Sequence, residues 1–217
     1  MRTFGLSDVW FILHAAQWTI GLSLMAFAGG ALGGLTLALA RTSESLAAQR
    51  AAAGFIQIFQ GTPLLMQLFL VFFGAPVVGL DISPWVAAGV ALILNTSAFL
   101  GEIWRGCIQA VPRGQWEAAQ ALGLKYGARM RKVVLPQAAR IALPPTVGYM
   151  VQVIKGTSLA AIIGFTEITR AGQIINNATF QPLIVFSVVG AVYFALCWPL
   201  SLWAGRFERK QAAAQAR

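Results

Sequence analysis

Ionisable side chains inside apolar stretches are the residues of this chain best placed to do chemistry. Glu102 and Arg105 stand three residues apart in one apolar run, and Lys155 stands in another. A charge inside a membrane is costly, so such a residue is a candidate functional site by default. Glu102 suits the amino group or a cationic side chain of a solute, and Lys155 suits a carboxylate. The alternatives are a self-contained pair between Glu102 and Arg105 and a Lys155 side chain that only reaches solvent at a helix end.

Uncharged polar groups and backbone breaks in the same runs form a second set of candidates. Pro63 has no amide, so the break at Gly61-Thr62-Pro63 leaves a carbonyl free. A free carbonyl is tolerated in a membrane only where protein or a water-filled cavity satisfies it. A plain kink, or bonds to neighbouring helices, would explain the same residues. Taken together, the candidates predict a solute pathway at Gly61, Thr62, Pro63, Asn95, Ser97, Glu102, Lys155 and Ser158.

The residue types that most enzymes need are scarce. The chain has one histidine, His14, and its two cysteines lie in or beside apolar runs, so neither a metal site nor a disulfide framework is indicated. No Ser/Lys dyad or pair of intramembrane carboxylates stands at a plausible spacing, and no glycine-rich loop ends in Gly-Lys-Ser/Thr. We therefore expect no enzyme, no ATP hydrolysis and no bound cofactor in this chain itself.

The elements that carry these residues are predicted to be membrane-spanning helices. The composition is 58% hydrophobic and 11% charged, whereas charged residues make up about 25% of a soluble domain. We expect an all-α integral membrane protein with one domain over residues 1–217. The first 17 residues lack a convincing signal sequence and predict a separate, short interfacial helix. Five stretches are long enough to cross a bilayer, at about 18–40, 55–73, 85–104, 141–164 and 183–203.

Basic residues mark the topology of these spans. Arg2 and Arg170 are the basic residues of the loops on one predicted side, and twelve others flank the first, third and fifth spans on the other side. The positive-inside rule then places the N-terminus outside and the C-terminus in the cytoplasm. Topology and attraction to anionic lipids account for the net charge of +9, so no nucleic acid partner is needed. The cytoplasmic set is Arg41, Arg50, Arg113, Lys125, Arg129, Arg131, Lys132, Arg140, Arg206, Arg209, Lys210 and Arg217.

The loop at residues 111–136 carries a predicted docking surface. Residues 115–122 predict a short helix that ends at Gly123, and residues 129–134 predict a second helix that stops at Leu135-Pro136. Alanine side chains allow a partner to approach closely, and a neighbouring carboxylate offers a charge-assisted contact. The helical spacing predicts that Ala118, Ala119 and Leu122 share one face, with Glu117 beside it.

Several sequence segments, in order along the chain, resemble one known family. Glu117-Ala118-Ala119, then Gly123, Val133 and Leu135-Pro136 at their spacing, resemble the signature of ABC importer permeases. Four further segments are similar to those of the polar amino acid branch, and the resemblance covers residues 17–210. These segments lie at Phe59–Gln67, at Ser97–Gly106 continuing to Gly114–Ala119, at Lys155–Leu159 with Glu167-Ile168, and at Phe207–Arg209.

The resemblance implies a fold, an assembly and a location. It implies the permease fold of a type I ABC importer in the bacterial cytoplasmic (inner) membrane, with two permease subunits, two ATPase subunits and a periplasmic or extracellular solute-binding protein. ATP and Mg²⁺ would be bound by the ATPase, and import would proceed by alternating access. Glu167 and Arg170 would face the binding protein. By this resemblance the coupling helix contacts the ATPase through Glu117, Ala118, Ala119, Leu122, Gly123 and Pro136.

Two alternatives stay open from the sequence. A stand-alone secondary transporter or channel would use Glu102 and Lys155 for ion coupling and would need no ATPase. The second permease subunit could be another copy of this chain or a homologue. Gln57 and Gln60 stand where the family often has Glu and Arg, which favours a pair with a homologue that supplies the charged contacts.

Overall fold

The computed structural model describes residues 2–215, and every regular element in that range is helical. Arg217, counted above among the basic residues, lies outside the described residues. The elements are α1 (Leu6–Thr42), α2 (Leu46–Gly61), α3 (Leu64–Val77), α4 (Pro84–Gln109), α5 (Arg113–Ala121), α6 (Tyr126–Arg129), the π-helix η1 (Met130–Val134), α7 (Leu135–Gly156), the 3-10 helix η2 (Thr157–Ile163), α8 (Ile168–Thr179) and α9 (Pro182–Gln215).

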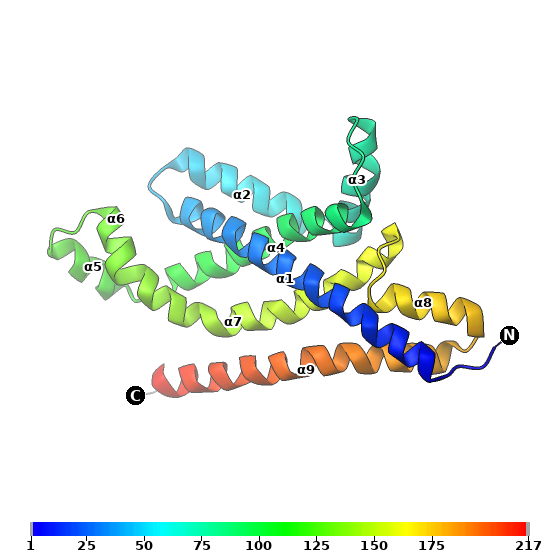
Figure 1. The fold of residues 1–217 in the computed structure, drawn as a ribbon. Helices are drawn as coiled ribbons and strands as arrows, with labels where there is room; N and C mark the ends of the chain where they lie inside the picture. Colours follow the sequence, from blue (N-terminus) through cyan, green and yellow to red (C-terminus); the bar gives the residue numbers. More distant parts are fainter. Residues whose placement is uncertain (1, 216–217) are drawn as a thin grey trace.

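The connections between helices gather at two opposite ends of the molecule (Figure 1). The turn from α1 to α2, the helices α5 and α6, and the last turns of α9 lie at one end, which we call the α5 end. The first residues, the turn from α3 to α4, and α8 lie toward the other, the α8 end. The basic stretches of the sequence therefore meet at the α5 end.

Four helical segments of residues 2–215 are long and apolar enough to cross a membrane, and a fifth is added if α2 and α3 count as one span. The four segments are Leu6–Thr42, Pro84–Gln109, Tyr126–Ile163 and Pro182–Phe207. The axes of α2 and α3 differ by 100° at Gly61-Thr62-Pro63. The predicted interruption is confirmed, and it is a sharp break rather than a kink.

The longest side-by-side packing in the fold joins α1 to α4. Gly30 and Gly34 of α1 lie against α4 so closely that a Cβ atom on Gly30 would stand 2.3 Å from Thr96 Cγ2. On Gly34 it would stand 2.8 Å from Leu100 Cβ. Small residues permit this approach of two backbones, which is how membrane helices gain packing contacts where lipid gives no hydrophobic drive. We call this contact the α1–α4 seam.

The prediction of a separate interfacial helix before residue 18 is wrong. Helix α1 begins at Leu6 and continues unbroken to Thr42. Residues 6–17 contain no Gly or Pro that would end a helix. The first turn is closed by Asp8, whose carboxylate accepts from the Gly5 amide at 3.0 Å and also pairs with Arg2.

The predicted helix stop at Leu135-Pro136 is also wrong. Helix α7 begins at Leu135, directly after η1, so α6, η1 and α7 form one continuous helical segment. The Leu135 amide donates to the Met130 carbonyl, five residues back, which is the bond of a widened π turn. Pro136 follows this π turn directly, near the start of α7.

Candidate functional site

The outer face of α5 is exposed and made of the predicted docking residues. Glu117 and Ala118 are exposed, and Leu122, just after the helix, is 79% exposed. Ala119, which the sequence placed on the same face, points inward and is 3% exposed. Gly123 ends the turn with φ of +72°, a value that L side chains rarely adopt. Large apolar exposure beside a carboxylate is typical of a protein contact surface.

The inner face of α5 is held by one arginine. The Arg129 guanidinium lies 5.8 Å from the Trp116 ring centroid and 5.9 Å from that of Tyr126, and its Nη1 donates to Gln120 Oε1 at 3.2 Å. Each cation–π contact contributes about 0.5–1 kcal/mol at an exposed site. Below it, Met130 and Val134 are buried in an apolar cluster with α1 and α4. The exposed face of α5 therefore rests on a packed base.

A single hydrogen bond ties this loop to the end of α1. The Tyr126 hydroxyl donates to the Thr42 carbonyl at 2.5 Å, across 84 residues of sequence. The last turn of a helix has carbonyls without a helical partner, so the phenol satisfies one of them. Nothing in the sequence pattern pointed to this contact. Pro136, the last predicted coupling residue, is exposed at the start of α7, where the loop meets the membrane span.

The break between α2 and α3 is closed by two amides. Gln67 Nε2 donates to the Phe59 carbonyl at 2.8 Å and to the Thr62 carbonyl at 3.1 Å, and Asn95 Nδ2 donates to Gln67 Oε1 at 3.1 Å. Both side chains are buried. The carbonyls freed by Pro63 are thus satisfied within the chain, as a membrane interior requires. Gln67 was not predicted, although a glutamine in an apolar run beside a proline break was a usable signal.

Several predicted pathway residues are engaged within the chain. The Ser97 hydroxyl donates to the Ile93 carbonyl at 2.7 Å, and the Ser158 hydroxyl donates to the Lys155 carbonyl at 2.7 Å. Glu102 forms the salt bridge with Arg105 that the sequence offered as its alternative, with Arg105 Nε donating to Glu102 Oε2 at 2.9 Å. The structure does not bring Glu102 and Lys155 together.

Several polar side chains are exposed on two of the membrane-spanning segments. Gln152 and Lys155 are exposed on α7, and Gln60 and Thr62 are exposed at the end of α2. Gly61 and Pro63, at the break itself, are exposed as well. We call this set the polar face. Polar side chains at membrane depth face protein or water rather than lipid.

Glu167, expected on an exposed loop, is fully buried, so that expectation is wrong. Its carboxylate accepts from the amides of Thr169 and Arg170, each at 2.9 Å, and from the Tyr193 hydroxyl at 2.6 Å. These bonds cap the start of α8 and tie it to α9. Burial raises the pKa of the Glu167 carboxyl above its ordinary value, and the hydrogen bonds partly offset this rise.

Comparison with known proteins identifies the family. The model of the binding-protein-dependent transport system inner membrane component matches residues 17–212. The chain belongs to this family. It is 35% identical to the glutamine transport system permease protein GlnP of Escherichia coli (strain K12), over 95% of this chain and 97% of that protein. It is 38% identical to the nopaline transport system permease protein NocM of Agrobacterium fabrum, over 88% of this chain and 83% of that protein.

A solved structure agrees in fold as well as in sequence. The crystal structure of an amino acid ABC transporter with histidines matches with a TM-score of 0.88 and 33% identity, covering 97% of this chain and 100% of that chain. The expected resemblance to amino acid ABC permeases is therefore confirmed. This family member is the permease component of an ABC amino acid importer, and in such importers the ATPase is a separate subunit.

Proposed function

We propose that this permease couples to its ATPase through the loop at residues 111–136. The observation that carries the proposal is the outer face of α5, where Glu117, Ala118 and Leu122 are exposed while the opposite face is packed. Exposed small and apolar groups on a stiff base suit a groove on a partner. Gly123 fixes the turn that follows, and Ala119 sets the depth at which α5 rests on its base.

Coupling requires that the ATPase favours one state of the permease over the other. A partner shifts an equilibrium only through contacts that differ between the two states. ATP and Mg²⁺, bound by the ATPase, would draw two coupling helices together and turn the permease outward, and hydrolysis would return it. This is alternating access, and it needs a second permease subunit, either another copy of this chain or a homologue.

The polar face is the proposed solute pathway. Lys155 supplies a positive charge for the carboxylate of an amino acid, and Thr62 and Gln152 supply hydrogen bonds. Gly61 and Pro63 keep the backbone accessible at the break. Three polar residues stabilise the pathway without contacting the solute, because their side chains bond to nearby carbonyl or amide groups. These residues are Asn95, Ser97 and Ser158. Glu102 forms a salt bridge with Arg105 and does not contact the solute.

The proposed orientation puts the α5 end in the cytoplasm. The basic loops gather there, which the positive-inside rule assigns to the cytoplasmic side. The broken pair α2 and α3 counts as one span, so five spans leave the N-terminus outside a bacterial cytoplasmic membrane. The α8 end then faces the periplasmic or extracellular solute-binding protein.

Charge reversal at the coupling face tests the first proposal. In Glu117→Arg, copurification of the ATPase and ATP-driven uptake should both fall more than about tenfold, because a lost charge contact at an interface costs several kcal/mol. Asp81→Arg reverses another exposed carboxylate, in the turn between α3 and α4, and should leave ATPase copurification unchanged. If the ATPase associates equally well with Glu117→Arg, α5 is not part of the interface.

Neutralising the polar face tests the pathway. In Lys155→Met, uptake should fall more than about tenfold while the ATPase still copurifies, because burying a carboxylate without its cation is costly. Thr36→Ala changes a hydroxyl already bonded within its own helix, α1, so its uptake should stay near that of the unaltered chain. Normal uptake in Lys155→Met would exclude that residue from solute contact.

The stand-alone transporter makes the opposite prediction. It would move solute in vesicles that contain this permease and no ATPase, with Glu102 and Lys155 coupling the flux to ions. The pairing of Glu102 with Arg105 argues against that role, because a carboxylate already paired with a guanidinium is not free to bind the coupling ion.

A further inference from the structure

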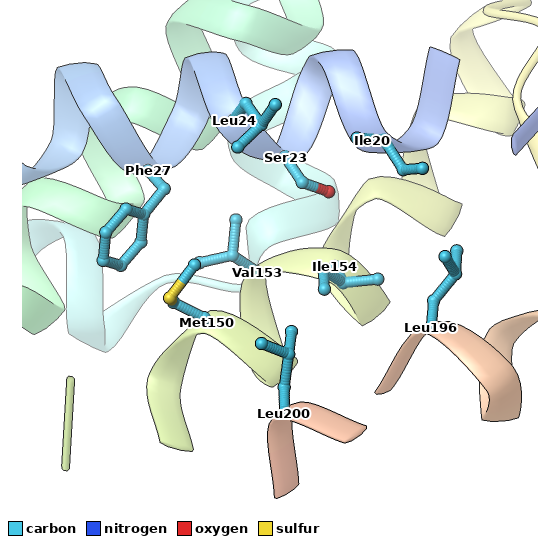
Figure 2. A pocket seen from close by; sticks show the side chains of 9 residues that line it. All are labelled: Ile20, Ser23, Leu24, Phe27, Met150, Val153, Ile154, Leu196 and Leu200. Atoms are coloured by element: carbon cyan, nitrogen blue, oxygen red, sulfur yellow. The ribbon is translucent and has the colours of Figure 1, made fainter. Parts of the chain in front are cut away.

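An apolar groove runs between α1, α7 and α9. It has a volume of about 260 Å³, and Figure 2 shows its walls: Leu24 and Phe27 from α1, Met150 and Ile154 from α7, and Leu196 and Leu200 from α9. Ser23 is the polar member of the lining, and its hydroxyl already donates to the Thr19 carbonyl at 2.7 Å. A water molecule needs two or more polar partners, so this groove calls for an apolar occupant.

The exposed polar residues of α7 are not among the residues that line the groove. Met150 and Ile154 line it, whereas Gln152 and Lys155 stand on the other side of α7 at the helical spacing. All three helices that form the groove are long and apolar enough to span a membrane. An apolar lining between membrane-spanning helices suits a lipid chain rather than a polar solute.

The wall formed by α9 continues toward the α5 end and becomes aromatic and basic. Leu196, Leu200, Trp203 and Phe207 follow one another at spacings of four, three and four residues, which places them on one face of the helix. The Trp203 and Phe207 rings meet edge to face, with centroids 5.1 Å apart. Both line a second hollow of about 300 Å³ together with two exposed arginines, Arg206 and Arg209.

The length of this wall matches one leaflet. Leu196 and Phe207 are eleven residues apart, which is about 16 Å along a helix. The hydrocarbon core is about 30 Å thick, so the wall spans roughly half of it. Tryptophan and basic residues mark the level where acyl chains meet headgroups. The apolar part of the wall is thus at acyl depth, and the arginines are at phosphate depth.

We propose that the groove and the hollow bind one anionic phospholipid. Its acyl chain lies along Leu196 and Leu200 in the groove, and its phosphate pairs with Arg206 and Arg209 beside Trp203. The positive charge of the two arginines selects an anionic headgroup, which is characteristic of the cytoplasmic leaflet. This site rests on the proposed orientation for the choice of leaflet, but it is independent of coupling through α5.

Native mass spectrometry of the full-length, detergent-solubilised permease tests the site. Phosphatidylglycerol and phosphatidylcholine with identical acyl chains are titrated in parallel, and the apparent dissociation constant of each is measured. Phosphatidylglycerol should bind at least about fivefold more tightly, because each basic residue near an anionic headgroup contributes about 1 kcal/mol. Equal binding of the two lipids would overturn the proposal.

Variants separate the acyl groove from the headgroup hollow. The double variant Arg206→Gln and Arg209→Gln should abolish the preference, and Leu200→Trp should weaken both lipids by filling the groove. Arg113→Gln removes another exposed charge at the same end, and Leu183→Trp adds the same bulk at an 83% exposed position of α9, so both controls should bind normally. Surface substitutions usually change stability little, so the variant at the two exposed arginines remains informative if Leu200→Trp misfolds. The proposed lipid site would be contradicted if the double variant still preferred phosphatidylglycerol. It would also be contradicted if a cysteine in Leu200→Cys cross-linked to a second protein chain.

Discussion

Glycines occur in two regions of this permease and have opposite roles there. At the α1–α4 seam, Gly30 and Gly34 lie within contact distance of side chains and backbone of α4. At the break between α2 and α3, Gly61 is exposed, and a Cβ atom there would meet nothing within 4 Å. The seam uses glycine to bring two helices together, and the break has glycine where the backbone turns by 100°.

The tight packing at the seam serves stability, whereas the exposed break serves function. The seam buries its polar hydroxyls, and its contacts leave no room for another atom, so it has one arrangement. The break satisfies its carbonyls through two amides and leaves one side exposed. We infer that the seam is the fixed frame of the permease and that the break and the loop at 111–136 move against it.

The largest expected effect comes from adding bulk at the seam. Gly30→Leu would force α1 away from Thr96 and should destabilise the fold by more than about 3 kcal/mol, since overpacking a filled core costs about 1–3 kcal/mol even for small additions. Size-exclusion chromatography of a fluorescent fusion would show loss of the monodisperse peak. Gly54→Leu, at a helical glycine with no neighbour within 4 Å, should fold normally. Folding of both variants alike would show that the seam is not tightly packed.

Removing the amide at the break should have the next largest effect. Gln67→Leu removes the bonds that Gln67 Nε2 donates to the Phe59 and Thr62 carbonyls and the bond that Gln67 Oε1 accepts from Asn95, and each lost hydrogen bond costs about 0.5–1.5 kcal/mol. The unfolding midpoint in detergent should fall clearly below that of the control Gln57→Leu, whose side chain is exposed. Equal midpoints would mean that the break needs no internal support, and the contrast with the seam would weaken.

The sequence predicts the break between α2 and α3 but not the contacts between distant helices. Hydrophobic length and the Gly/Pro positions predicted the apolar spans and the interruption at Gly61-Thr62-Pro63, because both depend on local composition. The burial of Glu167 and the bond from Tyr126 to Thr42 depend on which helices meet in space, so no spacing rule reaches them. Leu135-Pro136 failed as a stop signal because a proline that ends one helix can equally begin another.

The pH dependence of stability should report the burial of Glu167 at the α8 end. Burial raises the pKa of Glu167 above its ordinary value of 4.5, so above that pH the folded state holds its proton more tightly than the unfolded state does. The stability from this group is complete below pH 4.5 and is lost as the pH rises through the folded pKa. Glu167→Gln does not titrate, so its unfolding midpoint should fall less between about pH 4 and pH 8. If the unfolding midpoints of the two proteins change equally with pH, Glu167 is not the group responsible for the pH dependence.

The smallest structural change tests how the loop at 111–136 is linked to α1, one helix of the frame. Tyr126→Phe removes one hydroxyl and its bond to the Thr42 carbonyl, a loss of about 0.5–1.5 kcal/mol that should lower the unfolding midpoint only slightly. If that bond carries movement of α5 to α1, solute transported per ATP hydrolysed should fall while ATPase association is unchanged, because the exposed face of α5 is untouched. Tyr149→Phe, a tyrosine change on α7 away from the loop, controls for stability alone. A normal ratio of transport to hydrolysis in Tyr126→Phe would mean that α5 acts on the spans through η1 and α7, the continuous helical path that starts at the same residue.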